Sequence, residues 1–165
     1  MANATDTSVA SDREIVITRV IDGARPLVFR VFGDAKHLAN WWGPDGFTTT
    51  TRRFAFTPGG VWDFIMHGPD GTDYPNYVEY REIVPPERIV FLHGEKAGDP
   101  NAFVSTIRFI ERGARTEVEM RALFKTKALR DDAVERIGAI EGGNQTLGRL
   151  AAYVATLPAA ETGAP

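Results

Sequence analysis

The sequence contains no cysteine, which excludes disulfide bonds, thiolate metal ligands and a cysteine nucleophile. It also has no run of roughly 18 apolar residues, the length that a membrane-spanning helix needs. The opening MANATDTSVASD lacks the basic start and apolar centre of a signal peptide. These absences predict a cytoplasmic protein that does not insert into a membrane.

An excess of positive charge is also missing. The formal net charge is −3, and the short run KTKALR (residues 125–130) is the densest basic stretch, so binding to nucleic acid is not expected. The glycine-rich nucleotide motifs and the GxSxG elbow of hydrolases are absent. His37, His67 and His93 show no HxxxH or HxH spacing, so no metal site, cofactor or catalytic residue is assigned.

What is present indicates one globular domain over residues 12–158. A chain of 165 residues, 43% hydrophobic and 25% charged, is typical of a single folded domain with room for a sizeable core. Residues 1–11 and 159–165 are small and polar, and we expect them to form a disordered arm and a disordered tail.

The order of elements predicts an α+β fold. A β-branched strand at 13–22 is followed by two short helices at 25–34 and 35–42, and about six strands then succeed one another as hairpins. Residues ~129–157 carry an apolar arc at helical spacing, on which Ile137, Ile140 and Leu147 lie. The sequence therefore predicts an antiparallel sheet with one face covered by a long C-terminal helix.

Alternation within the predicted strands gives the candidate binding residues. Trp62, Phe64 and Met66 share one face of a strand, while His67 falls on the opposite face. A packed core explains this pattern as well as a binding site does. The candidate ligand-binding set is Trp41, Trp42, Trp62, Phe64, Met66, Tyr80, Phe91, His93, Phe109, Met120, Ile140, Gly143 and Asn144.

The last predicted helix contains unusual residues for an apolar face. Gly138, Gly142, Gly143 and Gly148 each cost roughly 1 kcal/mol relative to alanine in a helix interior, which indicates close packing or open space beside them. Asn144 needs a hydrogen-bond partner if it is buried, and a polar group on an apolar wall can orient a ligand.

The adjacent tryptophans in HLANWWGPDGF (residues 37–47) point in different directions. Neighbouring helix residues diverge by about 100°, so Trp41 and Trp42 cannot face the same spot. We expect one to plug the junction between the sheet and the helix and the other to lie at the mouth of a cavity. The Gly43–Gly46 turn then ends the short helix.

Four stretches together resemble a known family: HLANWWGPDGF, PGGVWDFIMHGPDGTDYP, YREIVPPERIVF and IEGGNQTLGRLAAYV. Over residues ~13–157 the chain is similar to the SRPBCC (START/birch-pollen-allergen-like, helix-grip) superfamily, in the branch of activator of heat-shock-protein-90 ATPase homologue-like domain proteins. The resemblance implies a bent antiparallel sheet that grips the C-terminal helix, with a cavity between them. Where this branch commonly has Gly-Trp, the chain has Gly142-Gly143, which either enlarges the pocket or admits a neighbouring side chain.

The resemblance implies binding of a small hydrophobic or aromatic ligand, oriented by Asn144, Tyr80 or His93. An alternative is a cyclase or hydrolase, which requires His93 or a carboxylate such as Glu141 inside the pocket. A third is an interaction protein marked by exposed apolar residues such as Leu38. A homodimer fits each hypothesis, whereas 165 residues leave no room for the additional N-terminal domain of the eukaryotic co-chaperones, which argues against a chaperone partner.

Overall fold

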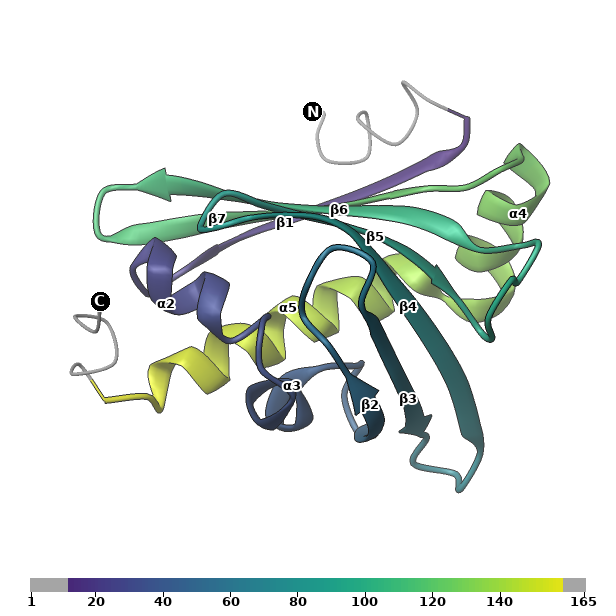
Figure 1. Cartoon of the computed structure of the whole chain (residues 1–165), viewed down its shortest axis with the longest axis horizontal. Helices are drawn as coiled ribbons and strands as arrows, with labels where there is room; N and C mark the ends of the chain where they lie inside the picture. Colours follow the sequence, from purple (N-terminus) through teal and green to yellow (C-terminus); the bar gives the residue numbers. More distant parts are fainter. Residues whose placement is uncertain (1–11, 159–165) are drawn as a thin grey trace.

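The computed structural model describes residues 12–158 (Figure 1). The predicted arm and tail, residues 1–11 and 159–165, lie outside the described residues. The elements follow in the predicted order, namely β1 (Glu14–Ile21), α2 (Arg25–Arg30), α3 (Ala35–Trp41), β2 (Thr48–Phe54), β3 (Val61–His67), β4 (Asp73–Val84), β5 (Arg88–Gly94), β6 (Phe103–Arg112), β7 (Arg115–Leu123), α4 (Lys127–Asp132), the π-helix η1 (Ala133–Ile137) and α5 (Ala139–Ala155).

All seven strands form one antiparallel sheet in the order β1-β7-β6-β5-β4-β3-β2. Hairpins join β2 through β7 in sequence, whereas β1 pairs with the last strand because the two short helices separate it from β2. The strands β2, β3 and β4 turn away from β5, β6 and β7, so the sheet is strongly bent (Figure 1). The predicted α+β fold, with a bent sheet and a long C-terminal helix, is confirmed.

The short helices α2 and α3 begin as their sequences predict. Pro26 occupies the first turn of α2, where a missing amide proton costs nothing. Asp34 caps α3, and its carboxylate accepts a hydrogen bond from the Lys36 amide at 2.8 Å. The backbone then leaves the helix at Trp42, immediately before the Gly43–Pro44 turn.

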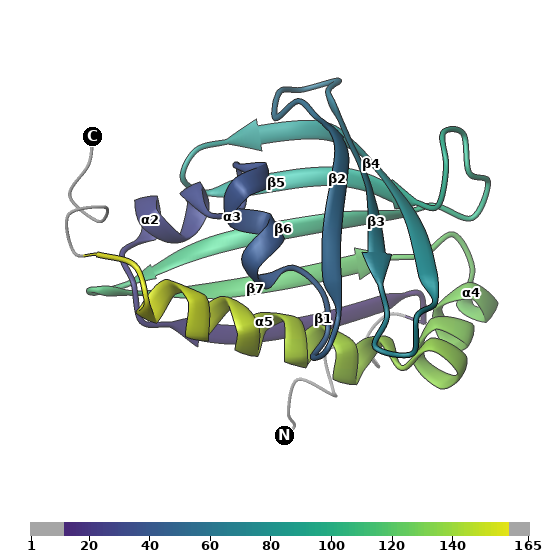
Figure 2. The same ribbon diagram turned by 90° about the horizontal axis from the view of Figure 1, so that it is seen from below.

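The C-terminal helix lies against the concave side of the sheet (Figures 1 and 2). Seen from below, α5 extends along β1 (Figure 2), and its main contacts are with β1 and with α3. Leu147, Leu150 and Val154 bury the apolar side of the helix. The position of α5 at the β1 edge decides which part of the concave face it covers.

The prediction of one continuous helix over ~129–157 is wrong at Gly138. This glycine has φ +73°, a left-handed conformation that breaks the chain into α4 with η1 on one side and α5 on the other. The break interrupts the helical phase, so Ile137 and Ile140, which we expected on the apolar arc, are 64% and 39% exposed.

Candidate functional site

One half of the concave face is a tightly packed aromatic core. The rings of Trp62 and Phe64 stack with centroids 3.8 Å apart, and Trp42 meets Trp62 edge-on at 5.2 Å. Tyr80 and Phe91 pack at 5.9 Å, and burial raises the pKa of the Tyr80 phenol. The candidate residues buried in this way are Trp41, Trp42, Trp62, Phe64, Tyr80, Phe91 and Phe109. Their side chains fill this half of the face, so they stabilise the fold.

The other half of the concave face is only partly covered. Met66 on β3, His93 on β5 and Met120 on β7 are candidate residues on the same face, and all three are half-buried. Asn76 on β4 and Phe103 on β6 lie on the same face and are also half-buried. Because α5 packs mainly against β1 and α3, these middle strands retain accessible surface on the side where the core would otherwise continue.

His93 is the polar centre of this open half. Its Nε2 lies 2.8 Å from Oδ1 of Asn76, and its ring centroid lies 4.9 Å from that of Phe103 and 6.0 Å from that of Phe91. Burial lowers the pKa of the imidazole to about 4, because the charged form loses its hydration among these rings. At neutral pH His93 is therefore an uncharged hydrogen-bonding group on an apolar wall.

The candidate residues of α5 do not line this face equally. Asn144 is exposed, and its amide donates to the carbonyl of Ile140 in the same helix at 3.1 Å, so it needs no partner from a ligand. A Cβ on Gly143 would lie 2.3 Å from Cδ1 of Ile17, so the side chain of Ile17 from β1 occupies the space beside this glycine. The two alternatives for Gly143 were an enlarged pocket and a neighbouring side chain in the vacated space. The structure shows the second, with the side chain of Ile17 in that space.

The two tryptophans have different surroundings, although their rings meet edge-on with centroids 5.5 Å apart. Trp41 is fully buried against α2, and its indole Nε1 donates to the carbonyl of Val31 at 3.2 Å. Trp42 turns toward the sheet and contacts Trp62 and Phe64. Trp41 is thus the plug at the junction, and Trp42 belongs to the aromatic core.

The sequence patterns did not identify three residues that are important in the structure. Arg149 of α5 donates through one guanidinium nitrogen to the carbonyls of Gly43 and Pro44, at 2.9 and 3.0 Å, and thereby ties the turn after α3 to the last helix. Asn76 and Phe103 share strand parity with buried neighbours, a signal that alternation alone could have given. Leu38, expected as an exposed apolar residue, is instead 1% exposed and belongs to the core.

His67 lies on the outer face of β3, as predicted. Its Nε2 lies 2.8 Å from the Thr50 hydroxyl and its Nδ1 lies 2.7 Å from the Asp73 carboxylate. Hydrogen bonds at its two ring nitrogens connect three adjacent strands, β2, β3 and β4, at a half-buried position. His67 therefore links three strands on the outer face of the sheet, and the sheet separates it from His93.

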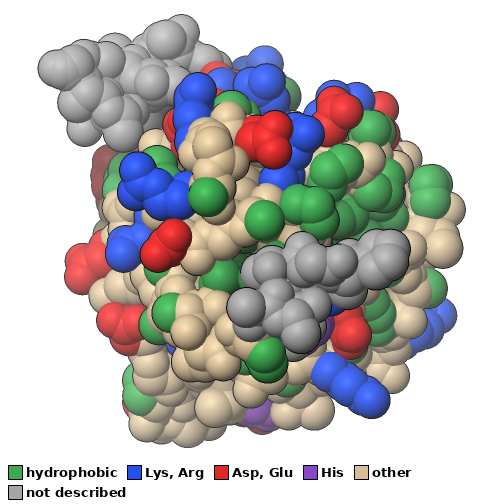
Figure 3. Space-filling model, turned by 90° about the vertical axis from the view of Figure 1, so that its left-hand side faces the viewer, with side chains coloured by type: hydrophobic (Ala, Val, Ile, Leu, Met, Phe, Trp, Pro, Cys, Tyr) green, Lys and Arg blue, Asp and Glu red, His purple; other side chains and the backbone are tan. Residues whose placement is uncertain are grey.

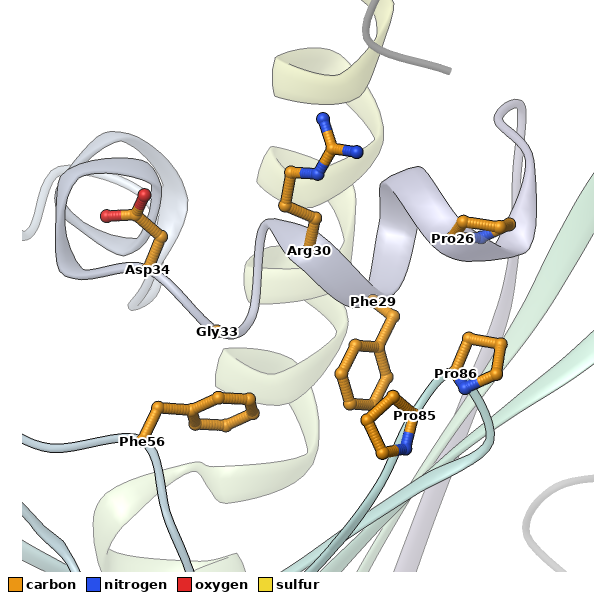
Figure 4. A pocket seen from close by; sticks show the side chains of 8 residues that line it. All are labelled: Pro26, Phe29, Arg30, Gly33, Asp34, Phe56, Pro85 and Pro86. Atoms are coloured by element: carbon orange, nitrogen blue, oxygen red, sulfur yellow. The ribbon is translucent and has the colours of Figure 1, made fainter. Parts of the chain in front are cut away.

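A hollow of about 470 Å³ lies outside the sheet, beside α2. Its lining includes the rings of Phe29, Phe56, Pro85 and Pro86 (Figure 4). The Arg30 side chain points away from the Phe29 ring in this view. Figure 3 faces the end of the molecule at which α2 lies and shows hydrophobic side chains gathered on part of it. None of the thirteen candidate residues lines this hollow.

Comparison with solved structures supports the same architecture. The chain superposes on a Nitrosomonas europaea protein with a TM-score of 0.79 at 20% identity, covering 88% of this chain and 96% of that one. For a Chromobacterium violaceum protein the TM-score is 0.76 at 25% identity, with 87% and 98% covered. For the AHSA1 protein of Silicibacter pomeroyi it is 0.68 at 22% identity, with 86% and 97% covered.

Among curated proteins, none matches the sequence. No helix within residues 12–158 is long and apolar enough to cross a membrane. The family described as Activator of Hsp90 ATPase homolog 1-like protein matches residues 23–155, which include both short helices, β2–β7 and the whole of the last helix. The chain therefore belongs to the family of Activator of Hsp90 ATPase homolog 1-like proteins, within the SRPBCC superfamily.

Proposed function

We propose that the protein binds a small apolar or aromatic molecule on the open half of the concave face, between the middle strands and α5. One observation carries the proposal: Met66, His93 and Met120 lie on the face that forms the core elsewhere, yet each retains accessible surface. An apolar wall with a few polar groups, among them the pair His93 and Asn76, has the composition of a ligand site.

The driving force would come from covering this residual apolar surface, at about 25 cal/mol per Å². Neither the hollow beside α2 nor a second one, lined by residues that include Tyr77, Leu92 and Gly94, has His93 in its lining, so the ligand gains its room when nearby side chains move. Met66 and Met120 suit this role because unbranched thioether side chains change rotamer easily and refill irregular gaps. The site is then adaptable, in contrast to the rigid aromatic half beside it.

A matched pair of substitutions tests the location. Ala122→Phe on β7 fills the open half from the inner face, whereas Val104→Phe adds the same ring on the outer face of the neighbouring strand β6. Thermal shift with a panel of apolar compounds should show stabilisation of the wild type and of Val104→Phe, and its loss in Ala122→Phe. Native mass spectrometry of the purified protein reports any ligand that copurifies. Equal shifts in the two variants would place the ligand elsewhere.

The other predicted roles stay predictions. A cyclase or hydrolase would need a base in the site, and an imidazole with a pKa of about 4 is a weak one at neutral pH. A homodimer is tested by light scattering and a chaperone partner by a pull-down. For the cytoplasmic location, fractionation of cells is the direct measurement.

A further inference from the structure

The orientation of the Asn76 side chain is fixed by its own strand. Its amide nitrogen Nδ2 donates to the carbonyl of Tyr74 at 3.0 Å, while its oxygen Oδ1 faces Nε2 of His93 at 2.8 Å. The reversed orientation would place the amide oxygen against the Tyr74 carbonyl, two acceptors at hydrogen-bond distance. Asn76 therefore presents an acceptor, and only an acceptor, to His93.

That acceptor determines the tautomer of His93. A neutral imidazole carries one N–H, and the other nitrogen is an acceptor. Since Oδ1 of Asn76 can only accept, Nε2 of His93 carries the hydrogen and donates it. The second nitrogen, Nδ1, is left as a lone-pair acceptor, and this holds at neutral pH because burial keeps the ring uncharged.

The acceptor Nδ1 has no protein partner and is accessible. Within residues 12–158 the His93 side chain makes one hydrogen bond, and its partner is Asn76. In the same part of the chain, the buried side-chain nitrogen and oxygen atoms without a hydrogen-bond partner are Arg25 Nε and Glu119 Oε1. Nδ1 of His93 is not in that set, so this atom is not fully buried, in agreement with the half-buried state of His93.

The surroundings of this acceptor carry no charge. Within residues 12–158 no charged side chain forms a hydrogen bond or ion pair with His93, and burial lowers the pKa of its ring. The aromatic neighbours are Phe64, Phe91 and Phe103, with centroids 6.2, 6.0 and 4.9 Å away. An anion brought here would lose its hydration without gaining a cation, and its oxygen would face a lone pair.

We propose, building on the function proposed above, that the ligand is an uncharged aromatic or alicyclic molecule whose hydroxyl donates a hydrogen bond to Nδ1 of His93. Ethers and carboxylates of the same shape are rejected. The phenyl rings around His93 hold the apolar body, and the hydroxyl donates its hydrogen bond to Nδ1.

Three probes of one shape test this inference by calorimetry at pH 7: 2-naphthol, which donates a hydrogen bond; 2-methoxynaphthalene, which cannot; and 2-naphthoate, which is charged. In the wild type we expect 2-naphthol to bind about tenfold or more tightly than the ether, because an unmade hydrogen bond to a desolvated acceptor carries a penalty of this order. The naphthoate should bind most weakly.

Two variants assign the preference to the polar pair. His93→Phe should abolish the advantage of 2-naphthol over the ether while the ether still binds, and His67→Phe, the same change on the outer face, should leave the preference intact. Asn76→Leu removes the acceptor that fixes the hydrogen of His93 on Nε2, so the preference for 2-naphthol over the ether should shrink. This variant keeps the test decisive if His93→Phe does not fold.

The results distinguish a failure of the hydroxyl preference from a failure of ligand binding itself. Equal binding of 2-naphthol and the ether by the wild type, or an unchanged preference in both His93→Phe and Asn76→Leu, would overturn this inference and leave the proposed function standing. Failure of all three probes, together with no stabilisation by the apolar panel, would overturn the proposed function itself.

Discussion

Adding one methyl group to α5 should have opposite effects at two adjacent glycines. Gly142→Ala places a Cβ 3.4 Å from the nearest atom, Cγ of Pro44, which is ordinary contact. Gly143→Ala places it 2.3 Å from Cδ1 of Ile17, which is overlap. Both changes gain roughly 1 kcal/mol of helix propensity, so the difference between them isolates the packing against β1.

The magnitudes follow from these distances. Gly142→Ala should stabilise the protein by up to about 1 kcal/mol. At Gly143 the overlap costs about 1–3 kcal/mol, as overpacking in a core does, and the net effect is a destabilisation of roughly 0–2 kcal/mol. The two variants should therefore differ by about 1–3 kcal/mol in the free energy of unfolding from urea denaturation.

A double-mutant cycle identifies the side chain responsible. Ile17→Val removes Cδ1 and alone costs about 0.5–1.5 kcal/mol, but in its presence Gly143→Ala should become stabilising. If Gly143→Ala stabilises the wild type as much as Gly142→Ala does, the space beside Gly143 is not occupied by Ile17 and the account of α5 given above is refuted.

Three further predictions concern the turn after α3 and the polar pair. Arg149→Leu leaves the carbonyls of Gly43 and Pro44 without their donor and should lower the free energy of unfolding by about 2–3 kcal/mol, with Arg149→Lys intermediate; no loss in urea denaturation would contradict the role of this arginine. His93 should destabilise the fold in acid: the unfolded imidazole titrates near 6.5 and the folded one has a pKa of about 4, so the unfolded state binds the proton first as pH falls. Stability should decline between these two values by about 3 kcal/mol, and His93→Gln should remove that slope from a series of denaturation curves. Asn76→Asp places a carboxylate on Nε2 of His93 and should raise the pKa of the imidazole in an NMR titration, whereas Asn76→Leu should not.

Local pattern predicted the faces of the strands but not the depth of each residue. Trp62, Phe64 and Met66 have the same parity on β3, and the sequence treats them alike. In the structure the first two lie under Trp42 and the third reaches the open half, because the position of α3 and α5 along the strand decides what is covered. Alternation has a period of two residues and carries no information about position along the strand.

Contacts between segments that are distant in the sequence could not be predicted from local patterns either. The pair of glycines in α5 indicated close packing or open space, and only the tertiary structure brings Ile17 of β1 to that point. The hydrophobic periodicity predicts a helix that continues through Gly138, although a glycine is the residue most able to adopt the left-handed conformation found there. The order of the seven strands and the two short helices, in contrast, follows from local signals, and the sequence predicts it; the division of the C-terminal helical region at Gly138 is the exception.

These two distant contacts account for the open half of the concave face. Gly143 lets the backbone of α5 approach β1 until Ile17 fills the gap, and Arg149 holds the other flank of the helix to the turn after α3. The helix is thereby fixed over the β1 edge and α3, its main contacts, and the middle strands around His93 stay partly uncovered. A larger side chain at position 143 would force the helix away from β1 or displace Ile17. Gly143 therefore leaves no space at its own position, and it lets α5 lie close to β1, away from the half-buried residues of β3 to β7.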